Sequence, residues 1–174
     1  MTDELVDKAW RARREGRLDE AERGLSAVVH ARRREGNGPE LVDALGKLAH
    51  VLRDLGRLDA ALPVCEDAVT ISRAGHNPLL LAHAVRHLGD LHREAGRLGD
   101  ADRCYSEALA LYRGSAVPDA LDLANALRPA ALLKEILGDR PLARQLFAEA
   151  RDRYREAGIE AGVQECARHL AQLE

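Results

Sequence analysis

The sequence predicts an all-α protein built from repeated helical hairpins, and three observations lead to this fold class. Ala and Leu, with 30 and 28 residues, make up one third of the 174-residue chain. Val, Ile and Thr number only 10, 3 and 2, and aromatic residues are 3%, whereas strands favour β-branched and aromatic side chains. Glycines recur at a nearly constant interval, which is typical of helical repeats. The composition therefore excludes an all-β fold, and the interval indicates a repeat array.

Two interleaved sets of glycines mark the expected helix ends. Members of the first set are 40, 40 and 42 residues apart, and a glycine of the second set follows each by 18 to 20 residues. Glycine is favoured directly after a helix because it adopts the left-handed conformation without steric penalty. We therefore predict four helix–turn–helix repeats over residues 2–36, 39–75, 78–114 and 118–158. The glycines are Gly16, Gly56, Gly96 and Gly138 inside hairpins, and Gly36, Gly75, Gly114 and Gly158 between them.

The predicted core follows from residues that share a position relative to each turn glycine. Small residues stand seven before it, and Ala stands five after it in every repeat. Larger apolar residues stand nine after it in most repeats. Small residues let paired helices approach closely, and larger ones fill the space between hairpins. The three sets are Ala9, Ala49, Gly89 and Ala131; Ala21, Ala61, Ala101 and Ala143; and Leu25, Cys65, Tyr105 and Phe147.

The turn motifs resemble those of the tetratricopeptide repeat family. They read GRLDEA at 16–21, GRLDAA at 56–61 and GRLGDA at 96–101, with a weaker copy, GDRPLA, at 138–143. The resemblance implies a right-handed α-solenoid whose first helices line a concave groove for partner peptides. It covers about residues 3–158 and rests on four copies in register.

Two departures from the family pattern concern the length of the repeat. The usual repeat has about 34 residues, so the period of 40 to 42 is closer to kinesin light chains and many bacterial regulators. The family's proline near the end of the second helix is absent, so we expect longer second helices. Basic residues stand there instead, and their positive charge interacts favourably with the negative C-terminal end of the helix dipole. They are Arg33, Arg73, Arg113 and Arg155.

Further signals predict helix starts, a bend and a terminal cap within a single domain spanning residues 1–174. Asn77-Pro78 and Val117-Pro118 predict starts, because proline suits the first helical turn. Pro129 predicts a kink in the first helix of the fourth repeat. Residues 160–173 are expected to form a capping helix, which repeat arrays need to cover the last core layer. Its apolar face comprises Ile159, Val163, Cys166, Ala167, Leu170 and Leu173.

Mapping the family's groove onto the chain identifies the candidate partner-binding residues. Three arginines share one position in successive repeats and are expected to form a column. Because guanidinium groups bind carboxylates, we expect an acidic or C-terminal peptide, with Trp10 as an apolar contact. The alternative is that these arginines pair with Glu15, Asp54 and Glu94 on their own helices. The candidates are Trp10, Arg13, Lys47, His50, Arg53, His83, Arg86, His87, Asp90, Arg93, Asn125 and Arg128.

One known way of binding is not expected here. A better-known subgroup of the family captures C-terminal carboxylates with a clamp of Lys and Asn. The matching positions do not reproduce that clamp, so chaperone tails of that type are disfavoured as partners. These positions hold Val6, Trp10, Lys47, His83 and His87.

The histidines and cysteines raise the question of hidden chemistry. His83 and His87 are four residues apart on one expected helix, a spacing that can hold a metal, with His50 or Asp90 as a third ligand. We interpret them instead as groove surface and expect no metal and no cofactor. Cys65, Cys104 and Cys166 lack the spacing of a zinc or redox motif. Cys65 and Cys104 fall at or beside packing positions and are expected to behave as small apolar residues.

Charge and hydropathy narrow the classes of partner. The net charge is −3 and the pI is near 6.2, without the basic stripe typical of nucleic-acid binders. No apolar run approaches a membrane span of about 20 residues, and the acidic start does not resemble a secretory signal. Arg outnumbers Lys 23 to 3, which is associated with GC-rich bacterial genomes. We therefore expect a cytoplasmic protein that binds neither nucleic acid nor membrane.

Three functions are compatible with these observations. The first is a non-enzymatic scaffold that binds a partner peptide or protein in the groove. The second is a regulatory or sensory repeat domain of a bacterial signalling system, and the third is a metal-dependent activity at His83 and His87. Monomer and homodimer both remain open, because Leu5, Leu18 and Leu25 could expose an apolar surface at the first hairpin.

Overall fold

The computed structural model describes residues 2–36, 38–115 and 119–173, and all regular secondary structure within these ranges is α-helical. The helices pair as hairpins, and the last helix follows the fourth hairpin, so the predicted all-α repeat fold is confirmed. The helices are α1 (Thr2–Arg14), α2 (Leu18–Glu35), α3 (Pro39–Asp54), α4 (Leu58–Ala74), α5 (Pro78–Glu94), α6 (Leu98–Arg113), α7 (Ala120–Ile136), α8 (Arg140–Glu156) and α9 (Glu160–Gln172).

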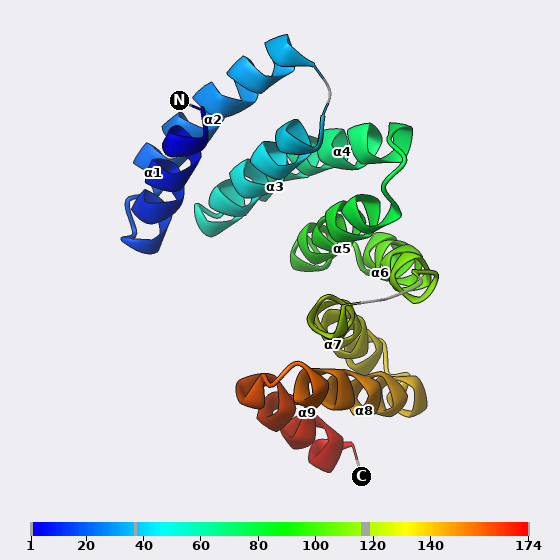
Figure 1. Ribbon diagram of the computed structural model, residues 1–174. Coiled ribbons are helices and arrows are strands. Elements are labelled where there is room, and N and C mark those ends of the chain that lie inside the picture. Colours follow the sequence, from blue (N-terminus) through cyan, green and yellow to red (C-terminus); the bar gives the residue numbers. More distant parts are fainter. Residues whose placement is uncertain (1, 37, 116–118, 174) are drawn as a thin grey trace.

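The hairpins follow one another in a curved array with the two termini at opposite ends (Figure 1). Odd-numbered helices of successive hairpins pack directly on one another, α1 on α3, α3 on α5 and α5 on α7. The inner side of a curved array is its shorter side, so direct contact between successive hairpins places these helices there. Helices α1, α3, α5 and α7 therefore form the inner face of the molecule.

Turn glycines close the first helix of each hairpin as predicted. Gly56 has a φ of 73°, in the left-handed region, and the amide of Arg57 donates a hydrogen bond to the Leu52 carbonyl at 2.9 Å. This satisfies a carbonyl that the helix end leaves without a partner. Gly75 and Gly114 also end helices as predicted, but the left-handed conformation expected of them is absent, since their φ values are −82° and −76°. Both follow a helix, but their own amides reach back to the helix with an ordinary backbone.

Side chains cap the starts of α5, α7 and α8. Asn77 accepts hydrogen bonds from the amides of Leu79 and Leu80, both at 3.1 Å, which confirms the predicted start of α5. The start predicted at Val117-Pro118 lies outside the described residues. Asp119 caps α7 instead, accepting from the Asp122 amide at 2.9 Å. Helix α7 then runs without interruption through the buried Pro129, and the kink expected there stays a prediction.

The core contains the small and large residues that the repeat pattern predicted. Ala21, Ala61, Ala101 and Ala143 are fully buried. Tyr105 fills more space than Leu25 or Cys65 at the same position, and Gly89 compensates for it. A Cβ atom on Gly89 would lie 2.8 Å from the Tyr105 ring. In the third repeat a larger residue, Tyr105, thus faces a smaller one, Gly89, and the core stays filled.

An outer ladder of ion pairs occupies the place of the missing proline. Arg73 pairs with Glu107 of the next hairpin and Arg113 with Glu149, both at 2.6 Å. Arg33 pairs with Asp67 in the same way. Each of these three arginines thus joins the second helices of successive hairpins, in addition to its expected interaction with the helix dipole. Arg155 pairs with Asp152 on its own helix at 2.7 Å.

Helix α9 covers the end of the fourth hairpin. Gly162 packs on Tyr154 so closely that a Cβ atom would lie 2.5 Å from the ring. The His169 ring stacks on Phe147 with 4.6 Å between the centroids. At the other end of the array, the expected exposure of Leu25 is wrong, because its side chain is completely buried, whereas Leu5 is 40% exposed.

None of the helices in the described ranges has both the length and the apolar content needed to cross a membrane.

Candidate partner-binding groove

All twelve predicted site residues lie on the odd-numbered helices. Six of the ten on α1, α3 and α5 line one cavity, whereas the two residues of α7 have other contacts. Asn125 accepts a hydrogen bond from the Tyr154 hydroxyl at 2.9 Å. Arg128 pairs with Glu165 of α9, also at 2.9 Å. The structure therefore separates these two from the rest of the predicted site and assigns them contacts with α8 and α9.

The cavity lies between the first three hairpins and measures about 350 Å³. Six predicted residues line it, namely Trp10, Lys47, His50, His83, Arg86 and His87. Sequence reasoning missed the apolar residues beside them, because their positions are those of ordinary core residues. They are Val42, Cys65, Ala68, Leu80 and Ala84.

Gly46 is the sequence signal that could have revealed this cavity. It lies in the middle of α3, where glycine costs about 1 kcal/mol relative to alanine. No neighbouring atom requires its small size, because a Cβ atom there would meet nothing within 4 Å. Gly46 lines the cavity, so the absence of a side chain keeps that space open.

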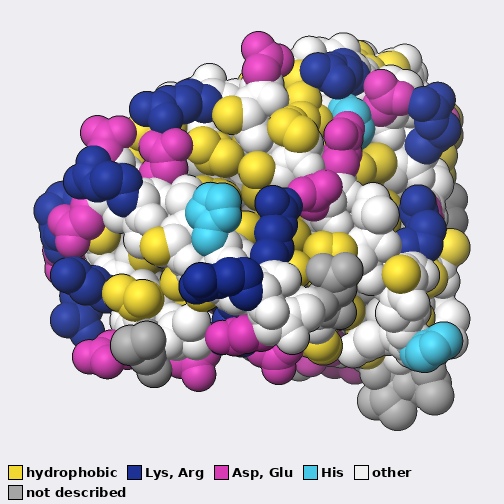
Figure 2. Space-filling model, turned by 90° about the horizontal axis from the view of Figure 1, so that it is seen from above, with side chains coloured by type: hydrophobic (Ala, Val, Ile, Leu, Met, Phe, Trp, Pro, Cys, Tyr) yellow, Lys and Arg dark blue, Asp and Glu magenta, His cyan; other side chains and the backbone are white. Residues whose placement is uncertain are grey.

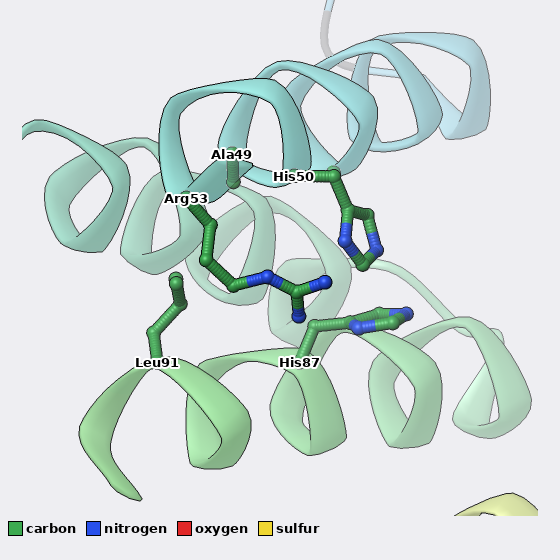
Figure 3. A pocket seen from close by; sticks show the side chains of 6 residues that line it. Ala49, His50, Arg53, His87 and Leu91 are labelled. Carbon is green, nitrogen blue, oxygen red and sulfur yellow. The ribbon is translucent and has the colours of Figure 1, made fainter. Parts of the chain in front are cut away.

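Three histidines, His50, His83 and His87, form an imidazole cluster at the cavity. The His87 ring packs edge to face against His50 and His83, with centroids 4.3 and 4.5 Å apart. Figure 3 shows His50 of α3 and His87 of α5 pointing toward each other, with the Arg53 side chain reaching into the same gap. The Nε2 atoms of His83 and His87 are 3.1 Å apart, so one ring donates to the other.

Partial loss of solvent contact keeps the imidazole cluster uncharged. It lowers the pKa of His50 to about 3 and the pKa of His83 to about 4, and the neighbouring His87 adds to both shifts. Burial also lowers the pKa of His87, although Asp90 acts in the opposite direction. At neutral pH the three rings are therefore neutral and present flat, weakly polar surfaces to the cavity.

Asp90 fixes the cluster from the side of α5. Its carboxylate accepts a hydrogen bond from the Tyr105 hydroxyl at 2.8 Å and lies 3.6 Å from both Arg86 and His87. Burial opposes ionisation of Asp90, but the nearby His87, the charge of Arg86 and the hydrogen bond from Tyr105 outweigh it and hold its pKa below the ordinary value. Asp90 is thus a structural anion that holds Arg86 and His87 in place.

The arginine column is largely occupied by internal ion pairs. Arg13 contacts Asp54 at 2.6 Å, and Arg53 lies 3.9 Å from both Asp54 and Glu94. Pairing with acidic residues is therefore the better description of Arg13 and Arg53. The expectation of partners on the same helix is wrong for Arg13, because Asp54 belongs to the next hairpin, and Glu15 pairs with Arg17 instead.

Trp10 lies between two cations at the N-terminal side of the cavity. The Arg13 guanidinium is 4.5 Å from the indole centroid, and the Lys47 ammonium is 5.9 Å away. Lys47 is also paired with Asp43 on its own helix. Cation–π contacts of this kind hold the indole in one orientation, so Trp10 forms a fixed wall of the cavity.

Neither metal ligation nor thiol chemistry has a built site in the described part of the chain. No three His, Cys, Asp or Glu side chains there are arranged to hold a metal ion. Burial raises the pKa of the Cys65 thiol to about 12 and of Cys104 to about 11, which disfavours the reactive thiolate. Cys65 is buried as expected, and Cys104 is partly exposed.

Surface charge is mixed on the face seen from above. In Figure 2, basic and acidic side chains are interspersed, and hydrophobic side chains lie between them. This face therefore does not present a continuous basic surface, in keeping with the net charge of −3.

Comparisons with solved structures support the repeat architecture. Kinesin-light-chain-type, nearly identical TPR-like repeats from Podosopora anserina superpose with a TM-score of 0.75 at 15% identity, covering 98% of this chain and 93% of theirs. A point variant of those repeats gives a TM-score of 0.76 at the same identity and coverage. BtubC (BKLC) from P. vanneervenii gives 0.73 at 18% identity, covering 98% of this chain and 78% of that protein. At these identities the similarity concerns the fold.

The sequence comparisons identify the family. No curated protein matches the sequence at a significant level. Two family models, each described as tetratricopeptide repeat, match residues 41–78 and 79–156. These ranges contain the GRLDAA, GRLGDA and GDRPLA turns. The chain therefore belongs to the tetratricopeptide repeat family.

Proposed function

We propose that this protein is a non-enzymatic interaction module that binds an extended segment of a partner protein along its inner face. Members of the family generally mediate contacts between proteins. The observation that carries the proposal is the cavity of about 350 Å³ bordered by Trp10 and the imidazole cluster. A hollow with apolar and neutral aromatic walls suits one apolar side chain of the partner.

The charges around the cavity support selection by an apolar side chain more than by charge. Lys47 is paired with Asp43, Arg13 with Asp54 and Arg86 with Asp90. Binding an acidic segment there requires competition with an internal carboxylate for each cation, which reduces the gain in free energy. These internal ion pairs therefore make an acidic partner segment less favoured at the cavity than the sequence alone suggested.

Filling the cavity from inside tests this function. In Gly46→Leu the added side chain enters space in which a Cβ atom meets nothing within 4 Å. Partners captured by the wild-type chain from its source cell are identified and then titrated by calorimetry. Burying one apolar side chain contributes about 1.5–3 kcal/mol, so the variant is expected to bind about 10- to 100-fold more weakly.

Gly46→Ala is the matched control, because a methyl group leaves most of the cavity open. It is expected to bind the same partner within about threefold of wild type, and both variants are expected to keep the helical circular dichroism signal. Equal affinity of Gly46→Leu and wild type for every captured partner would show that the cavity is not the binding site.

Four more specific expectations from the sequence remain predictions. They are a cytoplasmic location, a bacterial signalling role, the absence of nucleic-acid binding and the choice between monomer and homodimer. The identity of the captured partner tests the signalling role, and sedimentation at several protein concentrations tests the oligomeric state.

A further inference from the structure

A second, inner ladder of charged pairs runs along the odd-numbered helices. Each pair joins the residue three before one turn glycine to the residue two before the next turn glycine. Arg13 pairs with Asp54 in this way at 2.6 Å, and Arg53 lies 3.9 Å from Glu94. The next member in the same register is Arg93, and its counterpart on α7 is Ile136. The ladder is therefore interrupted between the third and fourth hairpins.

Arg93 differs from the other two arginines because it lacks a carboxylate partner. Its Nε atom lies 3.4 Å from the Tyr105 hydroxyl. Among the described residues, no carboxylate lies within 4.0 Å of the guanidinium, and its two amino groups make no hydrogen bond. The Tyr105 hydroxyl donates to Asp90, so it holds Arg93 from the Nε side and leaves the outer edge of the fork available.

Ile136, which stands where the second and third repeats hold an acid, and its neighbour Leu137 are unusually exposed apolar residues. Ile136 is 58% exposed and the adjacent Leu137 is 48% exposed, the two highest values among the large exposed hydrophobic residues of the described chain. A repeat array gains nothing in water from an isoleucine at a position that elsewhere holds Asp54 or Glu94. A bound partner would make the isoleucine favourable, because it would remove the apolar surface from water and supply the negative charge that Arg93 lacks.

We propose that Arg93, together with Ile136 and Leu137, forms a docking site for a partner carboxylate that lies next to an apolar side chain. The guanidinium fork suits a carboxylate with two parallel hydrogen bonds. Charge complementarity selects this occupant, because no carboxylate of the described residues lies within 4.0 Å of the Arg93 guanidinium and the exposed residues in register with it on α7 are apolar.

The docking site deepens the proposed function, on which it rests, by extending it one step along the same face. Arg93 lies six residues after His87 on α5, about 9 Å along the helix axis. An extended chain covers that distance with about three residues. The partner segment would therefore carry the apolar side chain that fills the cavity and the carboxylate that binds Arg93 about three residues apart.

Side-chain NMR of the full chain tests the docking site with a defined probe. N-acetyl-leucine carries a carboxylate beside an apolar side chain, and N-acetyl-leucinamide has the same shape without the charge. Titration with N-acetyl-leucine is expected to give a saturating shift of the Arg93 Nε–Hε signal, whereas the amide gives none. Arg53, which has internal partners, is expected to shift far less.

Two substitutions at one position complete the test. Ile136→Glu restores the ladder with an internal carboxylate and is expected to weaken N-acetyl-leucine binding at Arg93 about tenfold. Ile136→Gln has nearly the same size but no charge, so it keeps Arg93 available and loses only the apolar contact. Equal binding in wild type and Ile136→Glu, or equal shifts with the amide, overturns the proposal.

The NMR test of the docking site and the binding test of the cavity can fail independently of each other. Gly46→Leu is expected to leave the Arg93 response to N-acetyl-leucine unchanged, because Gly46 lies on α3 beside the cavity. A failed cavity test with an intact Arg93 response therefore contradicts only the proposed use of the cavity. An absent Arg93 response with cavity-dependent partner binding contradicts only the docking site.

Discussion

Two glycines inside helices have opposite relations to their surroundings, and this difference can be measured. At Gly89 an added methyl group would press on the buried Tyr105 ring at 2.8 Å, and at Gly46 it would enter open space. Overpacking costs about 1–3 kcal/mol, whereas alanine gains about 1 kcal/mol over glycine in a helix. We expect Gly89→Ala to lower the free energy of unfolding in urea and Gly46→Ala to raise it by about 0.5–1 kcal/mol. Changes of the same sign contradict this account.

The lowered pKa of His50 predicts how stability depends on pH. The pKa of His50 is about 3 in the folded chain and near 6.5 in the unfolded one. Between these values the unfolded chain binds the proton and the folded chain does not, so stability falls as the pH decreases below 6.5. Each fully shifted histidine contributes at most about 1.4 kcal/mol per pH unit. Above pH 6.5 it adds no slope.

Urea unfolding between pH 7 and pH 4 is expected to show a shallower decline in His50→Gln than in wild type. His83 and His87 are shifted in the same direction and keep part of the slope in the variant. The exposed His30 on α2 provides the control, and His30→Gln is expected to follow the wild-type curve. Parallel curves for all three proteins would contradict the assignment to His50.

At the scale of the helix, the two ladders differ in how far water reaches their pairs. Arg73 and Glu107 of the outer ladder have side chains that are 57% and 40% exposed, whereas Arg13 and Asp54 of the inner ladder are 25% and 27% exposed. Exposed pairs contribute about 0–1 kcal/mol, and screening by salt is weaker for partly buried ones. Double-mutant cycles in urea are expected to give the larger coupling free energy for Arg13–Asp54. A larger value for Arg73–Glu107 contradicts this order.

The helices were more predictable from the sequence than the contacts between them. Helix ends follow local chemistry, so Gly56 and Asn77 could be placed from the sequence alone. The partner of Arg13 depends on the rotation between successive hairpins, which no single repeat encodes, so its pairing with Asp54 could not be predicted. The interruption at Ile136 had a visible signal, because an apolar residue replaces an acid in one register position, but its meaning required the ladder to be known.

The cavity shows the same limit at the candidate site. The groove residues Trp10, His50 and His87 were predicted from the family pattern, and they do lie together. The open space between them depends on the side chain that Gly46 lacks, and a glycine within a helix pattern has no single interpretation. Site geometry thus required the three-dimensional arrangement of three hairpins.

At the scale of the whole molecule, the buried apolar residues form one cluster from Ala9 to Leu173, although each hairpin packs on its neighbours only. In such arrays stability is approximately a sum of repeat and interface contributions, so damage at one end stays local. Helix α9 buries Phe147 and Tyr154 at the end of the array. Its removal should therefore affect the last hairpin far more than the hairpins around the cavity.

A chain that ends at Gly158 tests this locality. Without α9, the exposed Phe147 and Tyr154 rings forfeit a few kcal/mol of apolar burial. Hydrogen exchange measured by mass spectrometry is expected to speed up in α7 and α8 and to stay near wild type in α3 and α5. Because the cavity is lined by α1, α3, α4 and α5, the truncated chain is also expected to bind cavity-dependent partners with unchanged affinity. Loss of exchange protection throughout the chain would instead show that the array folds as one cooperative unit and that α9 supports the groove from a distance.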